Sequence, residues 1–177
     1  MDENEKTISR ALLLDVESEY SREFVIEQAK QENWYYIYLL SKLVSREVSI
    51  LVDSNDNYWV DWGTIGSVEL SPPVGAVLPF KLWVHTHPSN TAYWSITDRN
   101  SLEIAKGILE KAMVLGENGS LTTMLHSAKS LDTGMMNSDM QWTEQEVIPW
   151  PSIYFEKYQR VYDTIKLPKF TLQDKYQ

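Results

Sequence analysis

Hydrophobic residues gather in short runs in some parts of the chain and recur at helical spacing in others. A buried strand is predicted from Ile8 to Val16, because this segment contains the compact apolar run Ala11-Leu12-Leu13-Leu14 and has charged residues at its ends. From Ser21 to about Val44 the apolar positions recur at helical spacing without proline or glycine, which predicts one long helix or two short ones. The aromatic cluster Trp34-Tyr35-Tyr36 in this stretch is expected to serve packing.

Strand-like and helical patterns then alternate along the chain. The segments Glu47 to Asp53 and Tyr58 to Trp62 flank turn-forming residues and predict a β-hairpin. After the hairpin, the pattern predicts a short strand near Ser67 to Leu70, a loop with Pro72, Pro73 and Gly75, and a strand into His85. A helix is then predicted over residues 98 to 112, followed by a hairpin of Ala112 to Leu115 with Leu121 to His126. An irregular stretch over residues 132 to 137 and a helix near Ser152 to Ile165 complete the chain. This order predicts an α/β fold with a mixed sheet between helices.

The length of the chain indicates one domain with a C-terminal tail. Its 177 residues, 43% hydrophobic and 12% aromatic, suffice for one well-filled core and are slightly short for two. No apolar run approaches the roughly 18 residues of a membrane span, and the acidic start Met1 to Glu5 does not resemble a signal peptide. A cytoplasmic protein without membrane contact is therefore expected.

Charge and cysteine content exclude several classes of function. A formal net charge of −9 without a basic patch in the sequence argues against nucleic-acid binding. The acidic balance is compatible with a partner that has a basic surface. Because the chain has no cysteine, disulfides, thiolate zinc ligands and thiol nucleophiles are all excluded.

Two of the three histidines have the spacing of metal ligands. His85 and His87 are two positions apart in a predicted strand, so both imidazoles lie on the same side of it. Asp98 can supply a third ligand. Two imidazoles and one carboxylate leave the fourth position of a tetrahedral zinc ion open, which is typical of a catalytic site.

Each half of this pattern also has a structural interpretation. Ser95 and Asp98 precede an apolar stretch of helical period and fit a capping box, in which serine and acid satisfy free backbone N–H groups. A His-x-His pair alone is often a surface feature. The combined spacing favours the metal site, and both roles can hold at once, because a carboxylate at a helix start can face an ion.

The loop between the two motifs and the third histidine have roles that the sequence leaves open. Tyr93 and Trp94 either line a cleft beside the ion or cap the core beneath the loop. His126 follows a strand-like run and is expected to be a core or edge histidine rather than a fourth ligand.

The residues HTHP at 85–88 and SITD at 95–98 resemble the signature of the JAMM zinc metalloproteases, also called the JAB or MPN-plus family. That signature is an upstream glutamate, then His-Ser/Thr-His-Pro, then Ser-x-x-Asp, and the resemblance covers about residues 8 to 128. It implies one catalytic zinc ion bound by His85, His87 and Asp98. The family's glutamate opens a hydrophobic strand, a place that Glu47 fits; Glu69 is the competing candidate.

The resemblance also implies the chemistry of a metal-dependent protease. Water activated by zinc would hydrolyse an amide or isopeptide bond, with Glu47 moving the proton to the leaving amine. The Ser95 hydroxyl would stabilise the oxyanion of the tetrahedral intermediate, and a purely structural role is the alternative for this serine. Two departures from the family pattern touch no ligand: Asp53-Ser54 stands where a glycine is usual, and residues 80–84 lack a glycine.

The implied fold and partners follow from the same family. A JAB/MPN-like sheet with helices in a three-layer, cytidine-deaminase-like arrangement is expected over residues 1–128, and a C-terminal helical extension over residues 129–177. The implied substrate is the bond that joins a ubiquitin-like modifier to an amine, with E1-like and E2-like conjugation proteins as further partners. A zinc peptidase acting on other peptides and a catalytically silent MPN-type binding scaffold are the alternatives.

Overall fold

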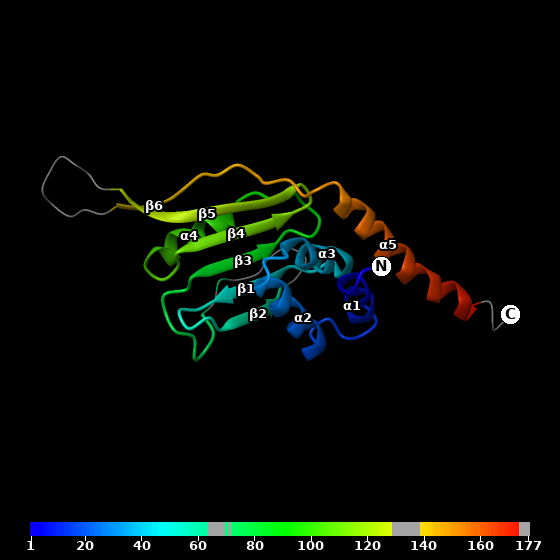
Figure 1. The fold of residues 1–177 in the computed structure, drawn as a ribbon. Coiled ribbons are helices and arrows are strands. Elements are labelled where there is room, and N and C mark those ends of the chain that lie inside the picture. Colours follow the sequence, from blue (N-terminus) through cyan, green and yellow to red (C-terminus); the bar gives the residue numbers. More distant parts are fainter. Residues whose placement is uncertain (64–69, 71, 129–138, 174–177) are drawn as a thin grey trace, which may run out of the picture.

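The computed structural model describes residues 1–63, 70, 72–128 and 139–173 (Figure 1). Within these ranges the strands form one six-stranded sheet in the order β2-β1-β3-β4-β5-β6, with helices beside it. The elements are α1 (Glu3–Ala11), α2 (Glu19–Lys30), α3 (Trp34–Val44), β1 (Val48–Val52), β2 (Tyr58–Trp62), β3 (Leu82–Thr86), α4 (Ile96–Ile104), a 3-10 turn (Ala105–Gly107), β4 (Lys111–Gly116), β5 (Gly119–Ala128), β6 (Asp139–Trp142) and α5 (Ile153–Gln173). The predicted α/β class with a mixed sheet is confirmed.

One pair of strands is parallel and the others are antiparallel. β3 runs parallel to β4, and α4 is the helix that connects them. β1 pairs with β2 and β3, and β5 pairs with β4 and β6, in antiparallel fashion. The loop that leaves β3 therefore enters α4 at the same edge of the sheet where β3 ends.

Successive residues of the central strands enter different cores. Val84 of β3 packs in a core with α1, α2, α3 and α5, whereas Trp83 packs in a second core with Leu102 of α4. His85 lies two residues after Trp83 and therefore faces the α4 side of the sheet. Figure 1 shows α1, α2 and α3 on the near side of the sheet and α4 on the other.

The predicted strand between Ile8 and Val16 is wrong, because this segment belongs to the helix α1 and the turn after it. Asp2 and Glu5 form a complete capping box at the start of α1. Ile8 and Ala11 lie on its buried face, three residues apart, whereas Leu13 is 72% exposed. The cap and the helical spacing therefore outweigh the apolar run.

The other predicted elements are mostly confirmed, with changed ends. The stretch from Ser21 forms two helices, α2 and α3, and the hairpins β1–β2 and β4–β5 and the helix α5 are present. The helix predicted over residues 98–112 already ends at Ile104, because a 3-10 turn follows it and the residues from Ala112 onward pair with β3 as part of β4. The predicted strand over residues 67–70 and the irregular stretch over residues 132–137 lie outside the described residues, Leu70 excepted, and β6 was not predicted.

The C-terminal helix α5 packs on the N-terminal helices. Arg160 of α5 forms an ion pair of 2.6 Å with the fully buried Glu5 of α1. The ring of Tyr154 stacks on Tyr35 of α3 at 4.1 Å, which confirms that the aromatic cluster of α3 serves packing. Although α5 has 21 residues, no helix of the described part of the chain is both long and apolar enough to cross a membrane.

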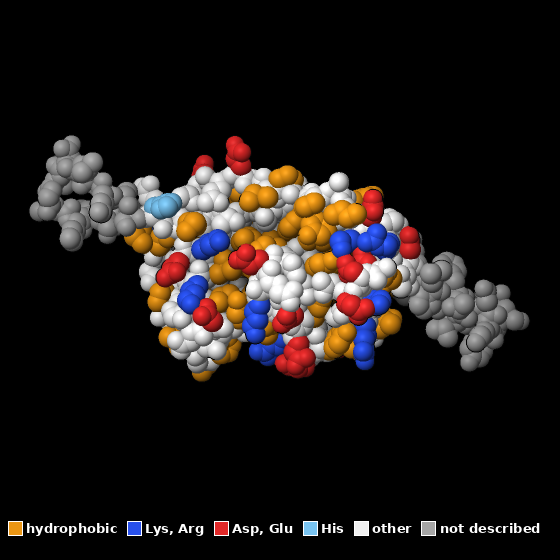
Figure 2. All heavy atoms as spheres, in the orientation of Figure 1, with side chains coloured by type: hydrophobic (Ala, Val, Ile, Leu, Met, Phe, Trp, Pro, Cys, Tyr) orange, Lys and Arg blue, Asp and Glu red, His pale blue; other side chains and the backbone are white. Residues whose placement is uncertain are grey.

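Charged side chains are mixed on the face formed by these helices. Figure 2 shows basic and acidic groups interspersed over it, with apolar side chains between them. This face has no segregated basic patch, and the expectation that the chain does not bind nucleic acid stays a prediction.

Acid should weaken one contact between α1 and α5. Burial raises the pKa of Asp2, but hydrogen bonds from Lys157, the Glu5 backbone and Tyr36 outweigh it and lower that pKa to about 2. The stabilisation from ionised Asp2 is therefore present above about pH 4 and is lost as the pH falls towards 2. Because Asp2 is 39% exposed, Asp2→Asn should lower the free energy of unfolding by no more than about 1 kcal/mol at pH 6. Urea titrations should show this difference vanishing near pH 2, and a constant difference would contradict the assignment.

Candidate metal centre

The connection from β3 to α4 brings together the three predicted ligands. His85 is in β3, His87 follows the last residue of that strand, and Asp98 lies in the first turn of α4. All three are buried, and their candidate ligand atoms lie within 4.8 Å of one another. The group has the composition and spacing of a metal site.

The carboxylate of Asp98 lies between the two imidazoles. Its Oδ1 atom is 3.1 Å from His85 Nε2, and its Oδ2 atom is 3.6 Å from His87 Nε2. The shorter contact lacks hydrogen-bond geometry, so neither ring nitrogen of His85 has a hydrogen-bond partner among the described residues, although the side chain is only 1% exposed. A buried polar atom without a partner costs about 1–3 kcal/mol, and a cation bound at Nε2 would remove part of that cost. The donor set therefore fits a divalent metal.

His87 is oriented by the backbone of the following loop. Its Nδ1 atom lies 3.3 Å from the carbonyl oxygen of Thr91. A proton on Nδ1 that donates to this carbonyl leaves the lone pair of Nε2 free on the side of Asp98. Such a contact on the second ring nitrogen is usual for metal-binding histidines.

The charges of the group also suit a cation. Burial lowers the pKa of His85 and outweighs the opposing effect of Asp98. For Asp98, burial raises the pKa, but the two imidazoles hold it well below its usual range. Burial also lowers the pKa of His87, and the nearby Asp98 carboxylate raises it more, with a contribution from Glu47. An ionised Asp98 and a neutral His85 are the forms that bind a metal.

Asp98 caps α4 and also faces the two histidines. The backbone N–H of Ser95 donates to Asp98 Oδ2 at 2.8 Å, and the backbone N–H of Asp98 donates to Ser95 Oγ at 3.1 Å. These two bonds form the capping box of α4. The cap fixes the carboxylate beside the histidines, so helix capping and ligand placement support each other.

Glu47 lies close to this group, directly before β1. Its side chain is 8% exposed, and its carbonyl oxygen accepts a hydrogen bond of 2.9 Å from Gly63 N–H. Two residues later, Ser49 pairs with His85, so Glu47 points to the same side of the sheet as the metal group. Its charge also contributes to the raised pKa of His87. The competing candidate Glu69 lies outside the described residues.

Tyr93 and Trp94 both contact the histidines. The ring of Tyr93, 45% exposed, is 4.9 Å from His87, so Tyr93 lies between His87 and solvent. The ring of Trp94 is 5.9 Å from His85 and also packs against the core beneath α4. Trp94 therefore packs both beside His85 and against the core.

The loop that carries these aromatic residues is tied to the β4–β5 turn. Ala92 N–H donates to Asn118 Oδ1 at 2.7 Å, and Glu117 N–H donates to the carbonyl of Asn90 at 2.9 Å. A Cβ atom on Gly116 would lie 2.1 Å from the Ala92 nitrogen, so only glycine permits this approach. The sequence predicted the hairpin that contains Gly116, but not this close approach to the loop.

Two residues that sequence reasoning missed hold the ring of His85. The indole of Trp83 stacks on His85 with ring centres 4.6 Å apart and planes 19° apart. The indole N–H donates to Ser49 Oγ at 2.9 Å in the interior. Because Nδ1 of His85 has no hydrogen-bond partner among the described residues, this stack orients the ring. The i, i+2 spacing of Trp83 and His85 could have indicated the stack, but Ser49 requires the strand register.

Removing the Ser49 hydroxyl should therefore weaken metal binding. Ser49→Ala leaves a buried indole N–H without a partner, and we expect a loss of zinc affinity of about 10-fold, within the range known for groups that support metal ligands. Zinc titration calorimetry measures the change. Ser120→Ala, at a buried serine of β5, is the matched control and should bind zinc like the wild type. Equal affinity of both variants would show that the stack does not position His85.

The departure from the family pattern at Asp53 has a structural explanation. Asp53 is fully buried, and its carboxylate accepts hydrogen bonds from the backbone N–H groups of Asn55, Asn57 and Val77. Burial raises the pKa of this carboxyl, but the hydrogen bonds, the largest from the Asn57 side chain, hold it well below its usual range. This side chain organises the β1–β2 turn, so the turn does not need a glycine there.

His126 is separate from the metal group. It lies in β5, is exposed and pairs across the sheet with Gln141 of β6. The described candidate ligand group contains the other two histidines only, as the sequence predicted.

Comparison with known proteins gave no match: no family model, no curated protein and no solved structure is similar to this chain. The resemblance to JAMM proteases therefore rests on the sequence motifs alone.

Proposed function

We propose that this chain is a zinc-dependent hydrolase of the JAMM type that cleaves the peptide or isopeptide bond at the C-terminus of a ubiquitin-like modifier. The observation that carries the proposal is the convergence of His85, His87 and Asp98 in a buried group whose first histidine has no hydrogen-bond partner among the described residues. A His, His, carboxylate set leaves one zinc position open for catalysis.

In this proposal the three ligands hold the ion and Glu47 moves the proton. Zinc, when bound, supplies Lewis acidity and lowers the pKa of a water to about 7. Glu47 accepts the proton of the attacking water and delivers it to the leaving amine, which requires a carboxylate beside the ligands and not among them. Its burial and its influence on His87 support that role.

Ser95 places a hydroxyl group beside the metal group. Its Oγ atom accepts the backbone N–H of Asp98 at 3.1 Å, and its side chain is among the groups that hold the pKa of the Asp98 carboxyl low. A hydroxyl donor held by a helix cap beside the metal group can stabilise charge that develops on the carbonyl oxygen. This role is the catalytic alternative to a purely structural serine.

The proposal includes the JAB/MPN-like form of the α/β fold. The mixed sheet, the parallel β3–β4 pair and the placement of α4 opposite the other helices support it. The C-terminal extension would then belong to the same unit, since α5 contacts α1 and α3. A modifier or its conjugates, and E1-like or E2-like proteins, are the proposed partners.

A cleavage assay with three substrates tests the function. Zinc-loaded protein is incubated with a modifier joined to a lysine side chain, with a linear modifier precursor and with an unrelated peptide. We expect cleavage directly after the modifier C-terminus, loss of cleavage with a chelator, and recovery with zinc. Cleavage of the unrelated peptide alone would favour the zinc peptidase, and zinc binding without any cleavage would favour the scaffold.

A further inference from the structure

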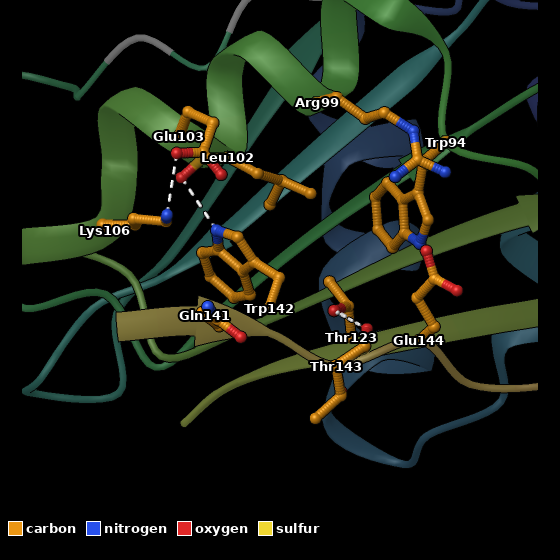
Figure 3. Close-up of a pocket in the computed structure, with 10 residues that line it drawn as sticks. All are labelled: Trp94, Arg99, Leu102, Glu103, Lys106, Thr123, Gln141, Trp142, Thr143 and Glu144. Carbon is orange, nitrogen blue, oxygen red and sulfur yellow. Dashed lines mark hydrogen bonds and ion pairs between the residues drawn. The ribbon is translucent and has the colours of Figure 1, made fainter. Parts of the chain in front are cut away.

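A pocket outside the metal group shares a wall with it. The pocket has a volume of about 380 Å³ and lies between α4 and the strands β5 and β6 (Figure 3). Trp94 lines it, and the same indole ring lies 5.9 Å from the ring of His85. A substrate whose carbonyl lies at the metal group therefore has this pocket beside it.

Most polar groups of the pocket are already paired. Lys106 and Glu103 form an ion pair of 2.7 Å, and Trp142 N–H donates to the carbonyl of Leu102 at 2.9 Å. Thr123 of β5 donates to the carbonyl of Thr143, directly after β6, and the Thr143 hydroxyl accepts the backbone N–H of Met124. Among the described residues, the Gln141 amide and two charged groups at the Trp94 end remain without a hydrogen bond or ion pair. The two charged groups can bind a ligand of opposite charge.

Arg99 and Glu144 are those groups. Neither forms an ion pair with another described residue, although both line the pocket. Figure 3 shows Arg99 reaching from α4 and Glu144 from the segment after β6, on either side of the Trp94 indole. The wall formed by α4 and the 3-10 turn after it has two cations, Arg99 and Lys106, and one carboxylate, Glu103, so it has a net positive charge of one, and Glu144 on the opposite wall balances it.

We propose that this pocket is a subsite that binds a carboxylate of the substrate through Arg99, an assignment that rests on the proposed function. A guanidinium offers a planar pair of donors that matches a carboxylate, and Leu102 with the indoles of Trp94 and Trp142 supplies an apolar lining for the stem of the side chain. The carboxylate belongs to an acidic side chain or to a free C-terminus, which have the same binding chemistry.

The position of Arg99 in the chain sets where this carboxylate lies. Arg99 directly follows the ligand Asp98, and consecutive Cα atoms are about 3.8 Å apart. Asp98 faces the histidines while Arg99 faces the pocket, as successive residues of a helix point in different directions. The carboxylate is therefore expected one or two residues from the bond that is cleaved.

Peptide titrations test the subsite. Acetylated Gly-Gly-Glu and Gly-Gly-Gln amides compare a side-chain carboxylate with its neutral form, and acetylated Gly-Gly-Gly with a free or amidated end tests the terminal carboxylate. Binding is followed by the nuclear magnetic resonance signals of the Trp94 and Trp142 indole N–H groups, with and without zinc. We expect Arg99→Gln to weaken binding of the preferred acidic peptide about 10-fold or more and to leave the neutral peptides unchanged.

Lys106→Gln is the matched control, because it removes the same charge from the same pocket at a cation that Glu103 already neutralises. It should change the affinity less than 2-fold. Equal binding of acidic and neutral peptides, or an equal loss in both variants, would overturn the proposal. An acetylated Gly-Gly-Lys amide is titrated as well. If this peptide binds most tightly and Glu144→Gln weakens its binding, the pocket binds a cation and the proposal is overturned.

The test separates this subsite from the metal chemistry. The titration without zinc measures Arg99 alone, since direct binding of the carboxylate to the ion is then excluded. If the protein binds zinc and cleaves its substrate normally but binds acidic and neutral peptides with equal affinity, only the subsite proposal is wrong. Selective binding of acidic peptides by a protein that fails to bind zinc would remove the proposed function and leave a carboxylate-binding pocket.

Discussion

Replacing Asp98 by asparagine should lower the zinc affinity about 100-fold or more while the protein stays folded. The substitution removes the negative charge that faces both imidazoles. Asparagine still offers an oxygen to the Ser95 N–H, so the cap of α4 is kept. Because groups that merely support ligands already change metal affinity 10- to 100-fold, loss of a ligand should cost at least as much. Zinc titration calorimetry measures the affinity, and circular dichroism checks the fold.

A thermal measurement gives an independent readout of the same site. At a free zinc concentration of 100 times the dissociation constant, binding to the folded state stabilises it by about 2.7 kcal/mol. The wild type should show that gain and Asp98→Asn should not. His126→Ala is the control, because this histidine is exposed in β5 and lies outside the ligand group. Undiminished zinc affinity in Asp98→Asn would reduce the group to a buried polar cluster, and the proposed function would fall with it.

The position of the ligand group was predictable because each part of it depends on local geometry. Period-two alternation places His85 and His87 on one side of a strand, and the capping signal places Asp98 in the first turn of a helix. Only a short connection separates the two elements. The remaining step, that the two elements face each other, follows from the parallel β3–β4 pair.

Features that depend on contacts between distant segments could not be predicted in this way. The support of His85 by Ser49 exists only because β1 pairs with β3 in one register, and the sequence does not state that register. The early end of α4 and the strand β6 likewise follow from pairing with neighbouring strands. At the N-terminus the error was different: the cap of α1 was overlooked, although Asp2 and Glu5 have the spacing of a capping box.

Replacing Glu47 by glutamine should abolish most of the turnover without loss of zinc. Glutamine has nearly the same size and can occupy the same buried position beside the ligands, but it cannot accept a proton. General acid–base catalysis contributes about 10²- to 10⁴-fold to such reactions, and we expect a decrease of kcat within that range. Because a group used only in the transition state changes kcat and kcat/KM together, both constants should fall by a similar factor. Turnover of a modifier–lysine conjugate measures them.

Glu69→Gln is the control for this experiment, since Glu69 is the competing candidate for the glutamate before the HTHP motif. We expect Glu69→Gln to keep wild-type turnover and both variants to keep wild-type zinc affinity. Full activity in Glu47→Gln with loss of activity in Glu69→Gln would show that Glu69, and not Glu47, is the general acid and base. Loss of zinc in Glu47→Gln would place this carboxylate among the ligands, and the open position required for hydrolysis would then be missing.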